Sequence, residues 1–180
     1  MARQHSRDRT VRAASEQDAA ACAAIYAPYV NDTAITFEIS APSPGEMAKR
    51  IAAATRSHAW LILEDAASVV GYAYGGFFNV RPAYRWACEV SVYLAPGLRR
   101  TGGGRALYEA LLPALAERGF RIAVAGMTLP NEASVGLHRA LGFEPVGTFS
   151  RIGFKHGRWH DVAWAQRVIG ARADPPREPA

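Results

Sequence analysis

Stretches of helical and of strand-like hydrophobic spacing alternate along most of the chain. Apolar residues recur every three or four positions in four segments, which predicts helices over residues 16–30, from 44 to beyond 54, 102–118 and 132–141. Shorter apolar runs predict strands over residues 10–13, 60–63, 69–78, 86–94, 122–125, 145–154 and 160–169. Helices and strands are mixed and no repeat occurs. The pattern therefore predicts one α+β domain over residues 10–169, with residues 1–9 and 170–180 as flexible tails.

Residues typical of helix ends sharpen these boundaries. Ser15 and Ser43 are good N-cap residues, and Pro44 is favoured at a first helical position. Gly119 is placed to end the third helix, whereas Pro113 inside that helix predicts a kink or an early break.

Composition narrows the class of protein. The chain has 180 residues, of which 49% are hydrophobic and 21% are charged, as in an ordinary globular domain. Its two cysteines, Cys22 and Cys88, exclude a disulfide framework and a CxxC metal or redox motif. The polar segment 1–12 lacks the apolar core of a signal peptide, and no apolar run is as long as a membrane span. We therefore expect a cytoplasmic protein without a membrane partner.

The net charge of +5 is unevenly distributed, because much of the excess lies in residues 1–12. A basic tail on a nearly neutral body is usually solvated, which argues against a nucleic-acid partner. The mild positive charge would also suit an anionic cofactor.

A glycine-rich segment stands between a predicted strand and a predicted helix. It reads Arg99-Arg100-Thr101-Gly102-Gly103-Gly104-Arg105. Glycines at a helix N-terminus bring backbone N–H groups close to a pyrophosphate, and the arginines add charge. A nucleotide P-loop is excluded because Ala106 follows where Lys and Ser or Thr are needed. A dinucleotide fingerprint lacks its third glycine at Leu107, so a simple glycine turn with surface arginines remains the alternative.

Other segments decide between these alternatives. The loop has the spacing R/Q-x-x-G-x-G/A, it follows the strand end Val90-Ser-Val-Tyr-Leu94, and Asn131 and Leu137-His-Arg-Ala-Leu-Gly-Phe143 come some 40 residues later. This combination resembles the acetyl-CoA-binding core of the GNAT N-acetyltransferases.

A closer resemblance covers about residues 10–168. The segments 83–94, 100–102, 129–131 and 153–162 look like those of the phosphinothricin and methionine sulfoximine N-acetyltransferases. The chain departs from that pattern at Arg99, where Gln is also common, and at Gly103, which replaces a bulkier residue.

The resemblance implies a GNAT fold, with a mixed, mostly antiparallel sheet that splays at the acetyl-CoA site and is flanked by helices. It implies acetyl-CoA as co-substrate and no metal. Main-chain groups of Val92, Tyr93 and Leu94 would bind the pantetheine arm. The phosphates would lie on Arg99, Arg100, Thr101, Gly102, Gly103, Gly104 and Arg105, with Asn131 and Ser134 as further cofactor contacts.

Glu89 is the candidate general base. By the two-residue period of a strand, Glu89, Ser91 and Tyr93 share one face, and Cys88 and Val90 face the core. The residues alone leave open a solvated glutamate or one paired with an arginine. The resemblance implies that it takes the proton of the acceptor ammonium, directly or through a water.

His138 is the candidate general acid for the leaving thiolate. Asn131, Ser134 and His138 share one helix face. We expect the opposite, core side to carry Ala133, Leu137, Ala140 and Leu141. A lone helix histidine is often a surface residue. The resemblance implies a catalytic one, as acid or as part of the proton path from Glu89.

The acceptor site is the last expectation. Phe37, Arg81, Tyr84, Tyr93 and Lys155 would form it, with Arg81 binding an anionic group and Lys155 reaching it either within the chain or across a dimer interface. The family commonly forms homodimers, so we expect one here. The predicted activity is acetylation of a glutamate-like amino acid analogue. The alternatives are another small amine, such as an amino acid or a polyamine, and a non-catalytic acyl-CoA-binding domain.

Overall fold

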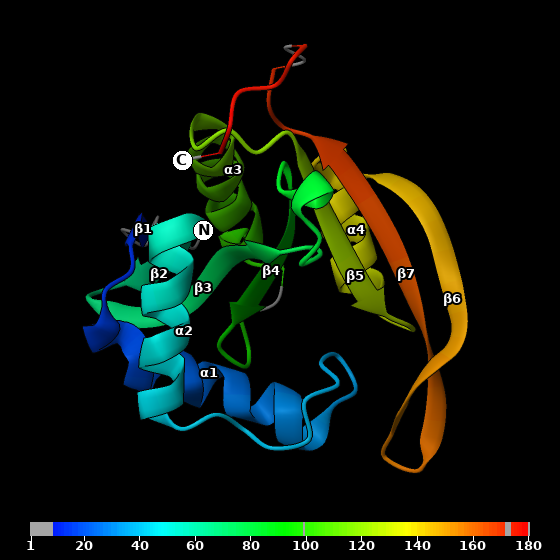
Figure 1. The fold of residues 1–180 in the computed structure, drawn as a ribbon. Coiled ribbons are helices and arrows are strands. Elements are labelled where there is room, and N and C mark those ends of the chain that lie inside the picture. Colours follow the sequence, from blue (N-terminus) through cyan, green and yellow to red (C-terminus); the bar gives the residue numbers. More distant parts are fainter. Residues whose placement is uncertain (1–8, 99, 172–173, 180) are drawn as a thin grey trace, which may run out of the picture.

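The computed structural model describes residues 9–98, 100–171 and 174–179. These residues form a seven-stranded sheet in the order β1-β2-β3-β4-β5-β7-β6 (Figure 1). The strands are β1 (Arg9–Ala13), β2 (Trp60–Asp65), β3 (Ser68–Phe77), β4 (Ala87–Leu94), β5 (Ile122–Thr128), β6 (Glu144–Lys155) and β7 (Arg158–Val168). All neighbouring strands are antiparallel except β4 and β5. The predicted fold class is confirmed.

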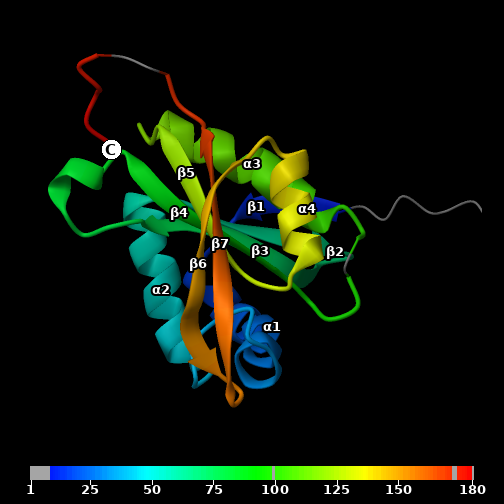
Figure 2. The same ribbon diagram turned by 90° about the vertical axis from the view of Figure 1, so that its right-hand side faces the viewer.

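Helices cover both faces of the sheet. They are α1 (Ala19–Asp32), α2 (Pro44–Ser57), α3 (Gly103–Glu117) and α4 (Glu132–Ala140), with short 3₁₀ turns η1 (Glu16–Asp18) and η2 (Pro82–Tyr84). Helices α1 and α2 lie on one face, and α3 and α4 lie on the other (Figure 2). None of the helices formed by the described residues is long and apolar enough to cross a membrane.

Each face of the sheet has its own apolar core. Leu107, Leu111 and Leu115 of α3 pack with Cys88 and Val90 on one face. The other core, under α1 and α2, is more aromatic. It contains Tyr26, Met47, Ile51, Trp60 and Tyr72. Because a strand alternates its side chains, residues that follow one another in β4 contribute to opposite faces.

The pair β4 and β5 determines the shape of the molecule. Only Ala87, Cys88 and Glu89 of β4 pair with β5, opposite Ile122, Ala123 and Val124. Beyond these pairs the two strands diverge, as Figure 1 shows. A parallel pair that stops early leaves an unpaired edge on each of the two strands. The sheet is therefore splayed, as the resemblance implied.

Two local expectations have different outcomes. The Ser43 hydroxyl accepts a hydrogen bond from the Glu46 N–H over 3.1 Å, so it caps α2 as predicted. The expected early break at Pro113 is wrong, because α3 continues through it to Glu117. The buried leucines of α3 supply packing that outweighs the hydrogen bond a proline cannot make.

The C-terminal segment lies against the domain. Within residues 174–179 there is no helix or strand, in line with their prolines. Trp86 Nε1 donates to the Arg177 carbonyl over 2.7 Å, and Arg85 forms an ion pair with Glu178. Both contacts reach the connection between β3 and β4. The flexibility of the two tails stays a prediction.

Candidate active site

The glycine-rich loop turns the chain from β4 into α3. Gly102 precedes α3 with a φ of +83°, a conformation that side chains rarely adopt. Gly103 and Gly104 are buried, and a Cβ on Gly103 would stand 2.8 Å from the Leu63 side chain. The loop therefore requires its glycines for the turn and for close packing. Gly103, which stands where the resembled family has a bulkier residue, lies close to the side chains of Leu63 and Leu94.

The same loop presents positive charge to solvent. Arg100 and Arg105 are exposed, whereas Arg99 lies outside the described residues. Arg9 Nη1 donates to the Thr101 carbonyl over 2.9 Å, which ties the loop to β1. The first N–H groups of a helix have no partner within the helix, and the end carries a partial positive charge. This donor set fits a pyrophosphate.

The β4 edge that faces the cleft fits the other part of acetyl-CoA. Past Glu89, this edge has no paired strand among the described residues. Main-chain groups of Val92 and Tyr93 are placed to bind an extended amide chain, as an added strand would. The Leu94 carbonyl accepts a hydrogen bond from the Tyr29 hydroxyl over 2.7 Å. Asn131 accepts from the Ser134 N–H over 3.2 Å and so caps α4 at the other side of the cleft. The described residues contain no cluster that could hold a metal ion.

Glu89 stands where β4 and β5 part. It is half-buried, and it pairs with Gly76 of β3 and Val124 of β5. Its neighbours Cys88 and Val90 are buried in the core on the other face, as the two-residue period predicts. No ion pair to Glu89 occurs in the described part of the chain. Burial raises the pKa of its carboxyl group, which suits a base that works near neutral pH.

Tyr93 shares the face of Glu89 but lies in an aromatic cluster. Its ring contacts those of Tyr26, Tyr29 and Tyr72 at centroid distances of 4.8, 5.1 and 5.5 Å. Burial raises the pKa of its hydroxyl well above the usual value. Beyond Glu89, this face of the sheet is therefore covered by packed tyrosine rings.

His138 is buried, not a surface residue. Only 4% of it is exposed, and its Nδ1 lies 2.8 Å from the Ser134 carbonyl. Because a carbonyl only accepts, Nδ1 carries the hydrogen of a neutral ring, and Nε2 accepts from the Tyr108 hydroxyl over 3.2 Å. Burial lowers the pKa of His138, which favours this neutral form. The expected core side of α4 is confirmed for Leu141, which is buried, and for Leu137, which packs against the core. It is wrong for Ala133 and Ala140, which are exposed, and the face with His138 points inward.

Tyr108 is the site residue that the sequence did not reveal. It is fully buried in α3 and has the spacing of a core residue. Burial is the main cause of its raised pKa, and the charges of Tyr74 and Glu89 add to it. Tyr108 therefore joins the site through its contact with His138. The signal in the sequence is only a hydroxyl on an otherwise apolar helix stripe.

The residues expected to bind the acceptor come from three segments. Phe37 is 38% exposed in the α1–α2 connection, residues 33–43. Arg81 and Tyr84 are exposed in the connection between β3 and β4, where Tyr84 contacts the Phe78 ring. Lys155 is buried at the end of β6, and burial lowers its pKa. The structure gives each residue a place, and their contacts with the acceptor stay predictions.

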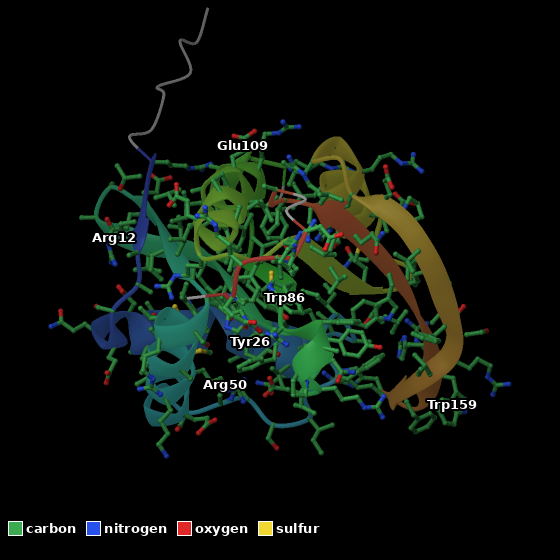
Figure 3. All side chains as sticks on the ribbon, turned by 45° about the horizontal axis from the view of Figure 1, so that its top comes forward. Arg12, Tyr26, Arg50, Trp86, Glu109 and Trp159 are labelled. Atoms are coloured by element: carbon green, nitrogen blue, oxygen red, sulfur yellow. The ribbon has the colours of Figure 1, made fainter. Side chains whose placement is uncertain are left out.

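A cavity of about 440 Å³ lies between helices α1 and α2 and strands β2 and β3. Its lining includes Tyr74 and Gly76, which pair with Ser91 and Glu89, so the cavity reaches the strand beside the base. Tyr26 and Arg50 also line it, from α1 and α2 (Figure 3). The Arg50 guanidinium is held by both oxygens of Glu38 at 2.7 and 3.1 Å.

A splayed sheet, a basic glycine loop at a helix N-terminus and a half-buried glutamate at the divergence define an acetyl-CoA-dependent acyltransferase. The chain belongs to the GNAT acetyltransferase family, because the family model described as "Acetyltransferase (GNAT) domain" matches residues 11–164. The predicted family and fold are confirmed, and so is acetyl-CoA as the co-substrate.

Relatives of similar length are similar in sequence over most of the chain. The chain is 37% identical over 165 residues to a phosphinothricin N-acetyltransferase of Streptomyces viridochromogenes, covering 92% of the chain and 90% of the relative. It is 36% identical over 163 residues to an L-methionine sulfoximine/L-methionine sulfone acetyltransferase of Pseudomonas aeruginosa, covering 87% and 92%. A solved phosphinothricin acetyltransferase of Sinorhizobium meliloti, in complex with AcCoA, matches with a TM-score of 0.88 and 37% identity, covering 96% and 93%.

Proposed function

We propose that the protein acetylates the α-amino group of a glutamate-like amino acid analogue, such as phosphinothricin or methionine sulfoximine. The observation that carries this proposal is the similarity to enzymes named for these substrates, which extends over about nine-tenths of the chain. When bound, acetyl-CoA supplies the acetyl group as a thioester. The chain's own residues bind the two substrates and move protons.

Glu89 acts as the general base in this proposal. An ammonium has no lone pair, so the acceptor must lose a proton before it can attack. A half-buried carboxylate with a raised pKa, which forms no ion pair with the described residues, is suited to take that proton directly or through a water.

His138 and Tyr108 act on the opposite side of the reaction. A neutral His138 that gives its Nδ1 hydrogen to a carbonyl has no hydrogen on Nε2, so it cannot act as the acid by itself. The hydrogen between Nε2 and the Tyr108 hydroxyl is the one that this pair has available. We therefore assign the donation of a proton to the leaving thiolate to the pair rather than to either residue alone. The proton that Glu89 takes from the acceptor ammonium replaces the one given up, so no tyrosinate remains in the buried site.

Arg81 binds the anionic end of the acceptor, while Phe37 and Tyr84 contact its apolar part. The Arg81 guanidinium makes no ion pair or side-chain hydrogen bond with the described residues, so it is free for a carboxylate or phosphinate. Charge-assisted, bidentate contacts of this kind are strong and directional.

Release of free thiol from acetyl-CoA tests the activity. The panel contains phosphinothricin, methionine sulfoximine, natural amino acids and polyamines at equal concentration. The proposal expects the largest kcat/KM with the first two. A preference for another amine would support the second candidate, GNAT chemistry on a different acceptor. Binding of acetyl-CoA without thiol release from any amine would refute an enzyme.

We also propose a homodimer. Strand β6 is an edge strand whose exposed apolar side chains include Val146, Phe149 and Phe154. Beside it, Val146 and Phe149 join Trp164 in lining a mostly apolar cavity of about 570 Å³. An exposed edge of this kind is usually covered by a partner. Sedimentation equilibrium should give the mass of a dimer, and Phe149→Lys should give a monomer; a monomeric parent would refute the proposal.

The cytoplasm is the proposed location, which is consistent with two free, buried cysteines. Resistance is the proposed consequence of the activity. Expression of the chain in a phosphinothricin-sensitive bacterium should raise the inhibitory concentration of the compound, and expression of Glu89→Gln should not.

A further inference from the structure

The Phe37 ring rests on a strand position that has no side chain. Gly153 of β6 faces it so closely that a Cβ at position 153 would overlap ring atoms Cε2 and Cζ and stand 2.8 Å from Cδ2. The His160 ring lies beside Phe37 at a centroid distance of 6.2 Å. The backbone at Gly153 has no positive φ, so the turn of the chain does not require glycine there. What requires glycine at this position is the ring of Phe37.

Lys155, two residues further along β6, binds the main chain at the end of α1 and in the loop that carries Phe37, residues 33–43. Its Nζ donates to the Val30 carbonyl over 2.6 Å and to the Thr36 carbonyl over 2.8 Å. Helix α1 has no basic residue in its last turn, so this ammonium supplies the positive charge that favours a helix C-terminus. His160 Nε2 donates to the Lys155 carbonyl over 3.0 Å and fixes the lysine in turn.

The other end of the loop is held by α1 and α2. Glu38, next to Phe37, accepts hydrogen bonds from Arg50 and from the Tyr26 hydroxyl. Phe37 therefore stands between two residues with fixed contacts: Thr36, which Lys155 of β6 binds, and Glu38, which side chains of α1 and α2 bind. Its ring has little room to move if a side chain occupies position 153 of β6.

We propose that Gly153 and Lys155 are positioning residues that set where Phe37 stands and thereby which acceptor side chains the enzyme admits. The inference rests on the proposed function for the place of Phe37 in the acceptor site. Lys155 acts in it through the loop, because both of its hydrogen bonds are to carbonyls of its own chain. In this inference both residues act on the position of Phe37 and not on the acceptor itself.

Gly153→Ala fills the space that the Phe37 ring occupies beside position 153 and so tests the proposal. Gly147→Ala is its matched control. Both glycines lie in β6 without a positive φ, but a Cβ at position 147 would meet no atom within 4 Å. Gly153→Ala should raise the acceptor KM by about 10-fold or more, because a displaced contact group misplaces the substrate. The KM for acetyl-CoA should not change, and Gly147→Ala should match the parent in both constants.

The Phe37→Leu background separates the clash between position 153 and the Phe37 ring from a general effect of the substitution on β6. A smaller side chain leaves room for the new methyl group, so adding Gly153→Ala to Phe37→Leu should cost almost nothing further. Lys155→Met, which keeps the stem and removes the ammonium, should raise the acceptor KM without changing that for acetyl-CoA. It provides the same readout if Gly153→Ala does not fold.

The amine used is the one that the parent acetylates best, so a failure of the proposed substrate class leaves this comparison intact. Three results would overturn the inference: acceptor constants of Gly153→Ala equal to those of Gly147→Ala, a full penalty that persists in the Phe37→Leu background, or an equal rise in both KM values. An unchanged acceptor KM in Lys155→Met would remove the lysine from it.

Discussion

Gly102→Val should separate the binding of the acetyl-CoA phosphates from ordinary backbone strain. Gly102 has a φ of +83°, and a Cβ there would meet no atom within 4 Å, so the strain comes from the backbone alone. A left-handed conformation costs an ordinary residue roughly 1–2 kcal/mol, and more for a β-branched one. If the chain relieves that strain by turning the peptide, the first N–H groups of α3 no longer point where the phosphates lie.

Gly157→Val is the control, because Gly157 has a φ of +73° and equally open surroundings in the β6–β7 turn. For a chain of this size, a change of 1 kcal/mol moves Tm by about 2–4 °C, so both variants should melt a few degrees below the parent without ligand. Acetyl-CoA at 100 times its Kd adds about 2.7 kcal/mol, which is a rise of roughly 5–11 °C.

Differential scanning fluorimetry with and without acetyl-CoA measures both quantities. The parent and Gly157→Val should each show the full ligand-induced rise in Tm when acetyl-CoA is present at about 100 times the Kd of that variant. At the acetyl-CoA concentration used for the parent, Gly102→Val should lose most of this rise. A rise in Gly102→Val equal to that of the control would mean that the phosphates bind elsewhere. An equal loss in both variants would mean that the measurement reports overall stability.

Three further predictions concern the chemistry. Glu89→Gln should lower kcat by roughly 10²–10⁴-fold, with partial recovery as pH rises toward the amine's own pKa. The raised pKa of Glu89 also means that folding favours its protonated form, so its contribution to stability is present below the unfolded pKa and is lost as pH rises through the folded value. Glu89→Gln should therefore melt above the parent at neutral pH and not at acidic pH. Tyr108→Phe leaves His138 Nε2 buried without a donor, which should lower the free energy of unfolding in urea by about 1–3 kcal/mol. Tyr108→Phe and His138→Ala should both lower kcat, with less recovery at alkaline pH than Glu89→Gln shows. Arg81→Ala should raise the acceptor KM by about 10-fold and leave that of acetyl-CoA unchanged, in steady-state kinetics; equal rises would give Arg81 a structural role.

The features of the fold that the sequence predicted are those with a local physical cause. The strand pattern of β4 identified which side chains face the core, because Cys88 and Val90 alternate with Glu89. Ser43 and Gly102 marked helix starts, since a cap and a left-handed turn each require particular residue types. Pro113 misled the same reasoning, because the packing of α3 on the sheet is a tertiary effect that no local rule contains.

The arrangement of the site depends on contacts between distant segments. His138 was assigned to a polar helix face, but that face is the inner one, where Tyr108 and Phe143 surround the ring. A histidine can be buried when both of its nitrogens have partners, and those partners come from Ser134 and from a helix 30 residues earlier. Hydrophobic spacing cannot identify such a residue, because it counts histidine as polar.

Lys155 illustrates the same limit over a longer span. Its two acceptors, Val30 and Thr36, lie 125 and 119 residues away in the chain. A lysine before a turn is typically solvated, and only the return of β6 to the end of α1 makes it a buried residue.

The early end of one strand pair connects these features. Because β4 and β5 pair only as far as Glu89 and Val124, the last residue of β4 that pairs with β5 carries the carboxylate, and the residues after it are those predicted to bind the pantetheine arm. Glu89 also pairs with Gly76 of β3, which has no side chain and lines the cavity beside this pair. Moving Glu89 two residues toward the strand end would keep its face but place it next to the aromatic cluster around Tyr93, away from the open end of the cleft. Moving it two residues back would place it at the first residue of β4, where pairing with β3 has already ended. The candidate base therefore stands where the sheet stops being continuous, and the proposed site is arranged around that point.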